Sequence, residues 1–151
     1  MTGIAIRRAG LADLDGLAPL FDSYRQFYAQ PSDEEGARNF LGERITCGES
    51  VIFLALLDEG PVAFCQLCPS FTSAGLARTF ILNDLFVAEE ARKRGIARAL
   101  LDHAAAWARK EGAVRLTLST AHDNQPAQAL YRDRGWARDE AFQVYHLPLQ
   151  G

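Results

Sequence analysis

Apolar and polar residues follow two different periods along the chain, and each period predicts one kind of element. Apolar residues three and four positions apart share one face of a helix, whereas alternation or a short apolar run indicates a strand. The helical spacing predicts four helices, over residues 11–28, 33–47, 95–111 and 125–134. The strand patterns predict about seven strands, over residues 3–8, 51–57, 61–71, 76–87, 114–119, 136–138 and 142–147.

The order of these elements predicts an α/β fold with helices on both faces of one central sheet. Because helices and strands are interspersed, we expect this sheet to be mixed. Residues typical of turns fit the element ends: Ser32 as an N-cap residue, and Asp58-Glu59-Gly60 as a hairpin turn. No repeat or linker interrupts the 151 residues, which predicts a single domain over 1–151.

The composition is ordinary for a globular protein, with 48% hydrophobic and 23% charged residues. A net charge of −3 disfavours a nucleic-acid partner, because affinity for the phosphate backbone needs a basic surface. No apolar run approaches the roughly 20 residues of a membrane span, and residues 1–8 lack the apolar segment of a signal peptide. We therefore predict a cytoplasmic protein without nucleic-acid or membrane partners.

The cysteines and histidines do not form a pattern typical of metal sites. Cys65-x-x-Cys68 lies in a strand-like run, where residues three apart point to opposite faces, and no second pair completes a zinc site. We interpret Cys47, Cys65 and Cys68 as packing residues. The histidines are scattered along the sequence, at His103, His122 and His146. We predict no metal ion and assign no catalytic role to these groups.

The segment between the strand that ends at Val87 and the helix that starts near Gly95 carries an unusual charge. A helix N-terminus bears partial positive charge and unpaired N–H groups, so it favours acidic residues. Four cations crowd this one: Arg92, Lys93, Arg94 and Arg98. A glycine there allows close approach of a ligand, so the turn is a candidate phosphate site. On charge alone, a solvated basic turn is an equally good interpretation.

Two motifs resemble those of a known family. Arg92-x-x-Gly95-x-Ala97 resembles the coenzyme A signature of the GNAT N-acetyltransferase superfamily, (Arg/Gln)-x-x-Gly-x-(Gly/Ala). Asn124-x-x-Ala127-x-x-Leu130-Tyr131-x-x-x-Gly135-Trp136 resembles the second motif of that superfamily. Taken singly, Asn124 would be interpreted as an N-cap and Tyr131 as a core aromatic residue. With both motifs in order, the chain is identified as a member of the GNAT superfamily. The resemblance implies the GNAT fold, with a central mixed, mostly antiparallel and twisted sheet of about seven strands and four helices on both faces.

The resemblance implies an N-acetyltransferase with acetyl-CoA as the donor. Backbone groups of Leu85, Phe86 and Val87 would then lie beside the pantetheine arm like an extra strand. The pyrophosphate would be held by the signature segment that Arg92 opens, with N–H groups of Lys93, Arg94, Gly95, Ile96, Ala97 and Arg98. Asn124 would hydrogen-bond the pantetheine arm. Tyr131 would protonate the leaving thiolate, because a phenol of pKa about 10 matches a thiol reasonably well.

The acceptor side needs a base, because a lysine-like amine is neutral in only about one molecule in 2,500 at pH 7. Asp84, an ionisable group in an apolar strand, is our candidate, and a carboxylate that only stabilises the sheet is an equal alternative. Asn83-Asp84 is similar to the Glu-Asp of diamine and polyamine acetyltransferases, but Asn83 lacks the charge that would hold a polyamine.

One predicted helix carries candidate acceptor-binding residues. The segment 24–28 resembles the yeast histone and polyamine acetyltransferase-like relatives. Tyr24 and Tyr28, one helical turn apart, could line an acceptor pocket with Glu34 or Glu35. An amphipathic helix face is the alternative for these two tyrosines, and on this pattern alone the somewhat better one.

Three functions follow from the resemblance. The first is acetylation of a primary amine of a small molecule, such as a polyamine, diamine or amino acid, by direct attack. The second is a protein or peptide acetyltransferase that modifies lysine or the N-terminus. The third is a module that binds CoA without catalysis, against which the intact Asn124 and Tyr131 argue. Dimers are common among such relatives, so we also consider a homodimer in which the final strands pair or exchange.

Overall fold

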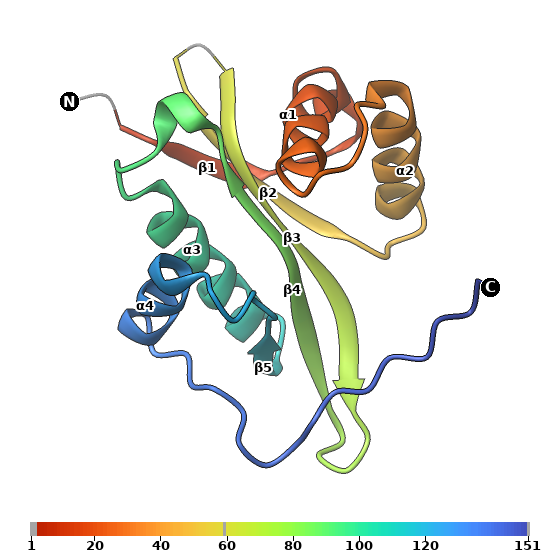
Figure 1. The fold of residues 1–151 in the computed structure, drawn as a ribbon, viewed down its shortest axis with the longest axis vertical. Coiled ribbons are helices and arrows are strands. Elements are labelled where there is room, and N and C mark those ends of the chain that lie inside the picture. The colour runs from red at the N-terminus through yellow and green to blue at the C-terminus, as the bar shows by residue number, and fades with distance from the viewer. Residues whose placement is uncertain (1–2, 59, 151) are drawn as a thin grey trace. The chain divides into compact units, whose positions relative to one another are not determined.

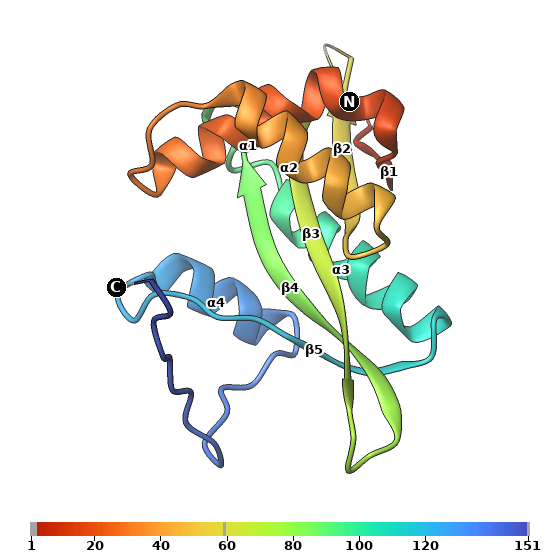
Figure 2. The same cartoon turned by 90° about the vertical axis from the view of Figure 1, so that its right-hand side faces the viewer.

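The computed structural model describes residues 3–58 and 60–150. They form two compact units, Met1–Ser119 and Thr120–Gly151, which are described separately. The first unit is built on a sheet whose strands lie in the order β1-β2-β3-β4-β5 (Figures 1 and 2). Their bounds are Ala5–Arg8, Val51–Leu57, Gly60–Thr72, Ala77–Val87 and Ala113–Thr117. The sheet is mixed, because β4 and β5 are parallel whereas the other three neighbouring pairs are antiparallel.

Helices cover both faces of this sheet. Helices α1 (Leu14–Phe27) and α2 (Glu34–Thr46) lie together on one face, and α3 (Ile96–Lys110) lies on the other (Figure 1). Short 3-10 turns precede α1 and α3, at Leu11–Asp13 and Glu89–Ala91. Within residues 120–150, the second unit contains one helix, α4 (Gln125–Asp133). The predicted α/β architecture, mixed sheet and four helices are therefore confirmed.

The core of the first unit has two layers because both faces of the sheet are covered. On one face, side chains of α1 and α2 pack on the sheet around Phe64 and Phe86. On the other, Ile96, Leu100 and Ala104 of α3 are buried at four-residue spacing. Strand β2 lies between the two layers, which explains why it reads as a continuous apolar run rather than as an alternating one.

A β-bulge in β4 changes which face its side chains point to. Gln66 pairs with Asp84 and Leu67 with Leu82, so Asn83 is an extra residue on β4. Before the bulge, Phe80 packs against Trp107 of α3. After it, Asp84 accepts a hydrogen bond from Tyr24 of α1, although unbroken alternation would put Phe80 and Asp84 on one face. The bulge therefore aims Asp84 toward α1.

The end of β4 has an open edge on the side of β5. The last residue pair between the two strands is Ile81 with Thr117. Beyond it, residues 82–87 of β4 pair with β3 only, within the part of the chain that the structure describes. Backbone groups of a strand edge are a template for an added extended chain.

Three details of the predicted elements need correction. The described residues form five strands, not seven: 136–138 and 142–147 are not strands, because a strand needs a pairing partner and not only an alternating pattern. The N-cap residue of α2 is Asp33, whose carboxylate accepts from the Gly36 N–H at 2.9 Å, and not Ser32. The predicted hairpin turn includes residue 59, which lies outside the described residues.

Candidate active site

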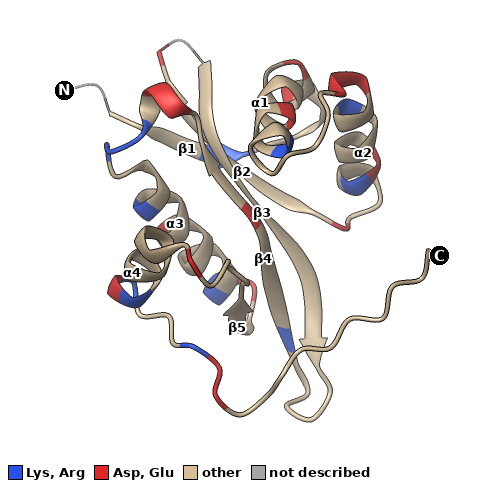
Figure 3. Cartoon of the chain, in the orientation of Figure 1, with Lys and Arg blue, Asp and Glu red and all other residues tan. Residues whose placement is uncertain are grey.

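The turn that leads into α3 is basic and open to solvent. Arg92, Lys93 and Arg94 are exposed, and Gly95 is the N-cap residue, with φ +77°. No described side chain caps this helix, and its first turn contains no acidic residue. A Cβ at Gly95 would meet nothing within 4 Å. Figure 3 shows the basic segment directly before α3, after an acidic 3-10 turn. The unpaired N–H groups and the cations are thus accessible to an external anion.

Arg92 has a structural role in the same turn. Its Nε donates to the Val87 carbonyl at 3.0 Å. Its guanidinium carbon lies 5.4 Å from the ring centroid of Phe27 and 5.7 Å from that of Phe86. These contacts tie the start of the turn to α1 and to the end of β4. They also place Arg92 at a cavity of about 590 Å³ between α1, the ends of β3 and β4, and the acidic Glu89 and Glu90.

Asp84 lies at the centre of a buried hydrogen-bond network. Its side chain is 8% exposed, and both carboxylate oxygens are engaged. Oδ1 accepts from the Tyr24 hydroxyl at 2.5 Å, and Oδ2 accepts from Nε2 of Gln66. Oε1 of Gln66 in turn accepts from the Ser50 hydroxyl at 2.5 Å. The network links α1 and β4 through β3 to the residue that precedes β2.

Gln66 and Ser50 are functional candidates that the sequence pattern did not single out. Gln66 is 2% exposed and Ser50 is 5% exposed. The sequence feature that could have identified Gln66 is a glutamine inside an otherwise apolar strand. A buried amide needs hydrogen-bond partners for its donors and its acceptor. Their partners lie far along the chain, so no local pattern reveals them.

Aromatic rings enclose the Tyr24 side chain. Its ring centroid lies 5.2 Å from that of Tyr28 and 5.6 Å from that of Phe64, both edge to face, and 5.8 Å from that of Phe86. The structure therefore brings Tyr24 into contact with both Tyr28 and Asp84. Asn83 is exposed at the bulge, and Glu34 and Glu35 are exposed at the start of α2.

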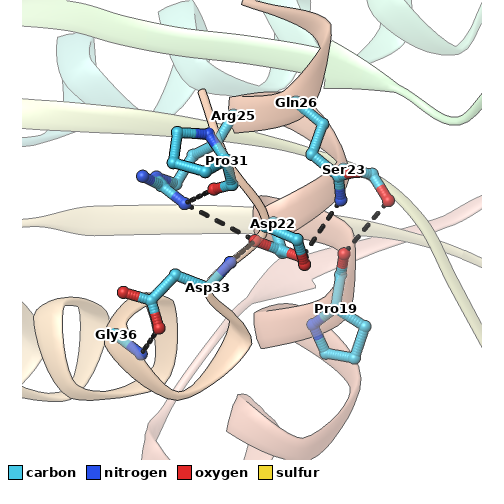
Figure 4. Close-up of polar contacts among 9 residues, drawn as sticks. Pro19, Asp22, Ser23, Arg25, Gln26, Pro31, Asp33 and Gly36 are labelled. Carbon is cyan, nitrogen blue, oxygen red and sulfur yellow. Dashed lines mark hydrogen bonds and ion pairs between the residues drawn. The ribbon is translucent and has the colours of Figure 1, made fainter. Parts of the chain in front are cut away.

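The connection between α1 and α2 is held by Asp22. Its buried carboxylate accepts from the Ser32 hydroxyl and from the Asp33 N–H, both at 2.7 Å, and from Nε2 of Gln26 at 3.1 Å. Arg25 lies 3.5 Å away as an ion-pair partner (Figure 4). The hydrogen bonds from Asp33 and Ser32 hold the pKa of Asp22 below its usual value. This clamp fixes the loop that follows Tyr28.

The second unit contains the other predicted motif. Asn124 is the N-cap residue of α4, and its Oδ1 accepts from the Ala127 N–H at 3.3 Å. The ring of Tyr131 lies 6.0 Å from that of Trp136, centroid to centroid. The N-cap interpretation of Asn124 is confirmed. Because the two units are described separately, the contact of Asn124 with the pantetheine arm stays a prediction. The role of Tyr131 as the acid stays a prediction as well.

Neither metal coordination nor a membrane span is seen in residues 3–58 and 60–150. No group of three or more His, Cys, Asp or Glu side chains within them could hold a metal ion. Burial raises the pKa of Cys65 to about 12, and it raises the pKa of Cys68 as well, so both thiols are poor ligands and nucleophiles. No helix in these ranges is long and apolar enough to cross a membrane.

The chain belongs to the acetyltransferase (GNAT) family, whose model matches residues 17–136. This range contains the basic turn, Asp84 and both predicted motifs. The protein is therefore an N-acetyltransferase of that family.

Individual relatives agree with this assignment. The chain is 44% identical over 142 residues to the uncharacterized N-acetyltransferase YhfO of Bacillus subtilis, covering 94% of this chain and 95% of the relative. A crystal structure of a probable acetyltransferase is 48% identical, with a TM-score of 0.92, over 97% of this chain and 99% of that one. An aminoglycoside N-acetyltransferase in complex with CoA shares the fold at 17% identity, with a TM-score of 0.80, covering 97% of this chain and 96% of that one. None of these names supports the polyamine or histone branch.

Proposed function

We propose that this acetyltransferase moves an acetyl group from acetyl-CoA to a primary amine of a small molecule by direct attack. The observation that carries the proposal is the open edge of β4. The edge includes residues 82–87, and α3 begins after the connection that follows, with its uncapped N-terminus at Gly95. The strand with this exposed edge therefore carries a candidate base, and the next helix begins with a candidate phosphate site.

The first unit fits the coenzyme that GNAT enzymes use. The N–H groups at Gly95, Ile96 and Ala97 suit a diphosphate, because the helix end is uncapped and the glycine leaves room for a close approach. Lys93, Arg94 and Arg98 add positive charge. The backbone of Leu85, Phe86 and Val87 offers an edge along which an amide-containing arm can add as a strand does.

Starting from an ammonium group, the reaction requires removal of one proton before attack and delivery of one proton to the departing sulfur. A second proton leaves the acylated nitrogen and replaces the one given to the sulfur. Bound acetyl-CoA supplies a thioester carbonyl, which the neutral amine attacks as the carbon–sulfur bond breaks. We assign removal of the amine proton to the Asp84 network. We assign protonation of the departing sulfur to Tyr131, with Asn124 holding the pantetheine arm. The family match across residues 17–136 supports placing both units in one domain over 1–151.

A small amine is favoured by the surroundings of Asp84. Asp84 is 8% exposed, and its carboxylate is bonded to Tyr24, whose ring packs against neighbouring rings. A slim primary amine suits such a recess better than a folded protein surface does. Asn83 in place of a glutamate removes one charge that a polyamine would use, so we favour acceptors with a single amine. Modification of a lysine or of a protein N-terminus is the second candidate.

The second unit supports a homodimer. Its final segment carries large apolar side chains that are at least 78% exposed: Phe142, Val144, Tyr145, Leu147 and Leu149. Exposed apolar runs of this kind mark interaction surfaces. We propose that this segment pairs with a second copy of the chain in the cytoplasm. Sedimentation velocity tests this, since Val144→Asp with Leu147→Asp should then yield a monomer.

A thiol-release assay with acetyl-CoA and a panel of amines tests the proposed reaction. The panel contains simple alkylamines, amino acids, polyamines and lysine peptides. We expect acetylation of one or more small amines at rates well above those on peptides. Faster acetylation of peptides would favour the protein acetyltransferase. Binding of CoA without thiol release on any acceptor would favour the module without catalysis.

A further inference from the structure

Each oxygen of the Asp84 carboxylate accepts a hydrogen bond from the protein. Oδ2 accepts from Gln66 and Oδ1 accepts from the Tyr24 hydroxyl, and the side chain is 8% exposed. Tyr24 is half-buried, so part of this residue is accessible at the surface of the first unit. A base behind such a residue does not meet an acceptor amine directly.

We infer that the hydroxyl of Tyr24 is the group that meets the acceptor amine and that it passes the amine proton to Asp84. This inference rests on the proposed function. A phenol oxygen that donates its one proton still has lone pairs with which it can accept from an ammonium group. At 2.5 Å, the Tyr24–Asp84 contact is a short hydrogen bond to a carboxylate, suited to proton transfer. Tyr24 is therefore assigned as a catalytic residue, beyond a role in lining the acceptor pocket.

The proton balance of this relay is closed. One N–H bond of the ammonium group breaks as an O–H bond forms at Tyr24. The original O–H bond of Tyr24 breaks as a new one forms at Oδ1 of Asp84. The amine loses one proton, Asp84 gains one, Tyr24 is unchanged, and no group is oxidised or reduced. The neutral amine then has the lone pair with which to attack the thioester.

Gln66 and Ser50 are positioning residues in this relay. The Ser50 hydroxyl donates to Oε1 of Gln66, which orients the amide so that its NH₂ group faces Asp84. That amide can only donate to the carboxylate, so it holds Oδ2 without competing for the transferred proton. Oδ1 is thereby left directed at Tyr24.

The test uses Tyr24→Phe, which keeps the ring and its aromatic contacts but removes the hydroxyl. Two probe acceptors are compared: N-acetyl-lysine amide, which offers only an ε-amine, and glycinamide, which offers only an α-amine. At pH 7 the ε-amine is neutral in about one molecule in 2,500 and an α-amine in about one in ten. Tyr28→Phe is the matched control, because it removes a phenol one turn away that has no hydrogen bond to Asp84 among the described contacts.

We expect Tyr24→Phe to lower kcat/KM at pH 7 at least about 10-fold more for the ε-amine than for the α-amine, because the ε-amine depends more on assisted deprotonation. Raising the pH toward the pKa of the amine should restore part of this loss. Tyr28→Phe should change KM, but it should show neither the difference between the two acceptors nor the recovery at high pH. Asp84→Asn should show the same dependence on acceptor and pH, and the double variant should be no worse than the poorer single one.

Two results would overturn the relay while leaving the proposed function intact. One is an equal loss for both acceptors with an unchanged pH profile, which would give Tyr24 a packing role only. The other is no loss at all. If the wild-type protein uses only one probe, the pH profile of Tyr24→Phe on that probe decides. If the wild-type protein acetylates neither probe nor any amine of the panel, the proposed function itself fails and the relay with it.

Discussion

Asp84 lies near the end of β4, and Gly95 lies at the start of α3. The two sites differ in whether the protein itself supplies the partners of their polar groups. The charge of Asp84 is satisfied inside the protein, by Tyr24 and Gln66. The basic turn at Gly95 has neither a side-chain cap nor an acidic first turn in the described structure. A buried group whose hydrogen-bond partners come from the protein contributes to the free energy of unfolding as well as to the proposed reaction. A basic helix N-terminus without a side-chain cap or an acidic first turn indicates an anionic partner from outside.

The first effect that follows from this contrast is a loss of CoA affinity in Gly95→Glu. A carboxylate at the helix N-terminus would occupy the space and reverse the local charge that a diphosphate needs. We expect CoA affinity to fall by at least about 100-fold, or about 2.7 kcal/mol, measured by calorimetry. Gly112→Glu is the matched control: it introduces the same residue at a similar φ, +82°, at the opposite end of α3. That variant should share the backbone strain but keep CoA affinity.

Tyr131→Phe tests the acid on the second unit. Loss of the proton donor should lower kcat by about 10² to 10⁴ while CoA binding persists. Steady-state rates and calorimetry on the same preparation separate the two quantities. Tyr145→Phe removes an exposed phenol from the same unit and should leave kcat unchanged. Wild-type turnover by Tyr131→Phe across the pH range would exclude this residue as the acid.

Gln66→Leu removes the hydrogen bonds that link Gln66 to Asp84 and to Ser50. The carboxylate of Asp84 and the hydroxyl of Ser50 would each lose a buried partner, so we expect the free energy of unfolding to fall by about 1–3 kcal/mol. Denaturant titration measures this. Gln30→Leu, the same change at an exposed position, should stay within about 0.5 kcal/mol of wild type. Equal values for the two variants would mean that the network contributes nothing to stability.

Asp22→Asn gives the smallest of these effects and a defined pH dependence. Because the pKa of Asp22 is lowered in the fold, its charge stabilises the native state above the unfolded pKa of about 3.9. That contribution is lost as the pH falls through the lower, folded pKa. We expect the variant to be about 1–2 kcal/mol less stable at pH 7, with the difference shrinking in acid. Asp15→Asn, at a side chain that is 88% exposed, is the control and should stay within about 0.5 kcal/mol of wild type at pH 7.

The first unit was largely predictable because its signals are local. The apolar run of β2, the four-residue spacing in α3 and the motif at Gly95 each report on neighbouring residues. The bulge was not predictable, since one extra residue at Asn83 leaves the pattern unchanged while it redirects Asp84. The network through Gln66 joins positions distant in sequence, which no periodicity records.

The errors have the same origin. Residues 136–138 and 142–147 have the composition of strands, but pairing depends on a partner that the pattern does not specify. Ser32 and Asp33 are both good N-cap residues. The Ser32 hydroxyl donates to Asp22, across the loop, and that leaves Asp33 to cap α2.

Hydrogen exchange of backbone amides with and without CoA tests the central claim most directly, because it reports where the coenzyme lies. The account predicts added protection at two places in the first unit: residues 85–87 on the open edge of β4, and residues 95–98 at the start of α3. CoA binding that protects neither segment, or protects only amides elsewhere in the chain, would contradict it.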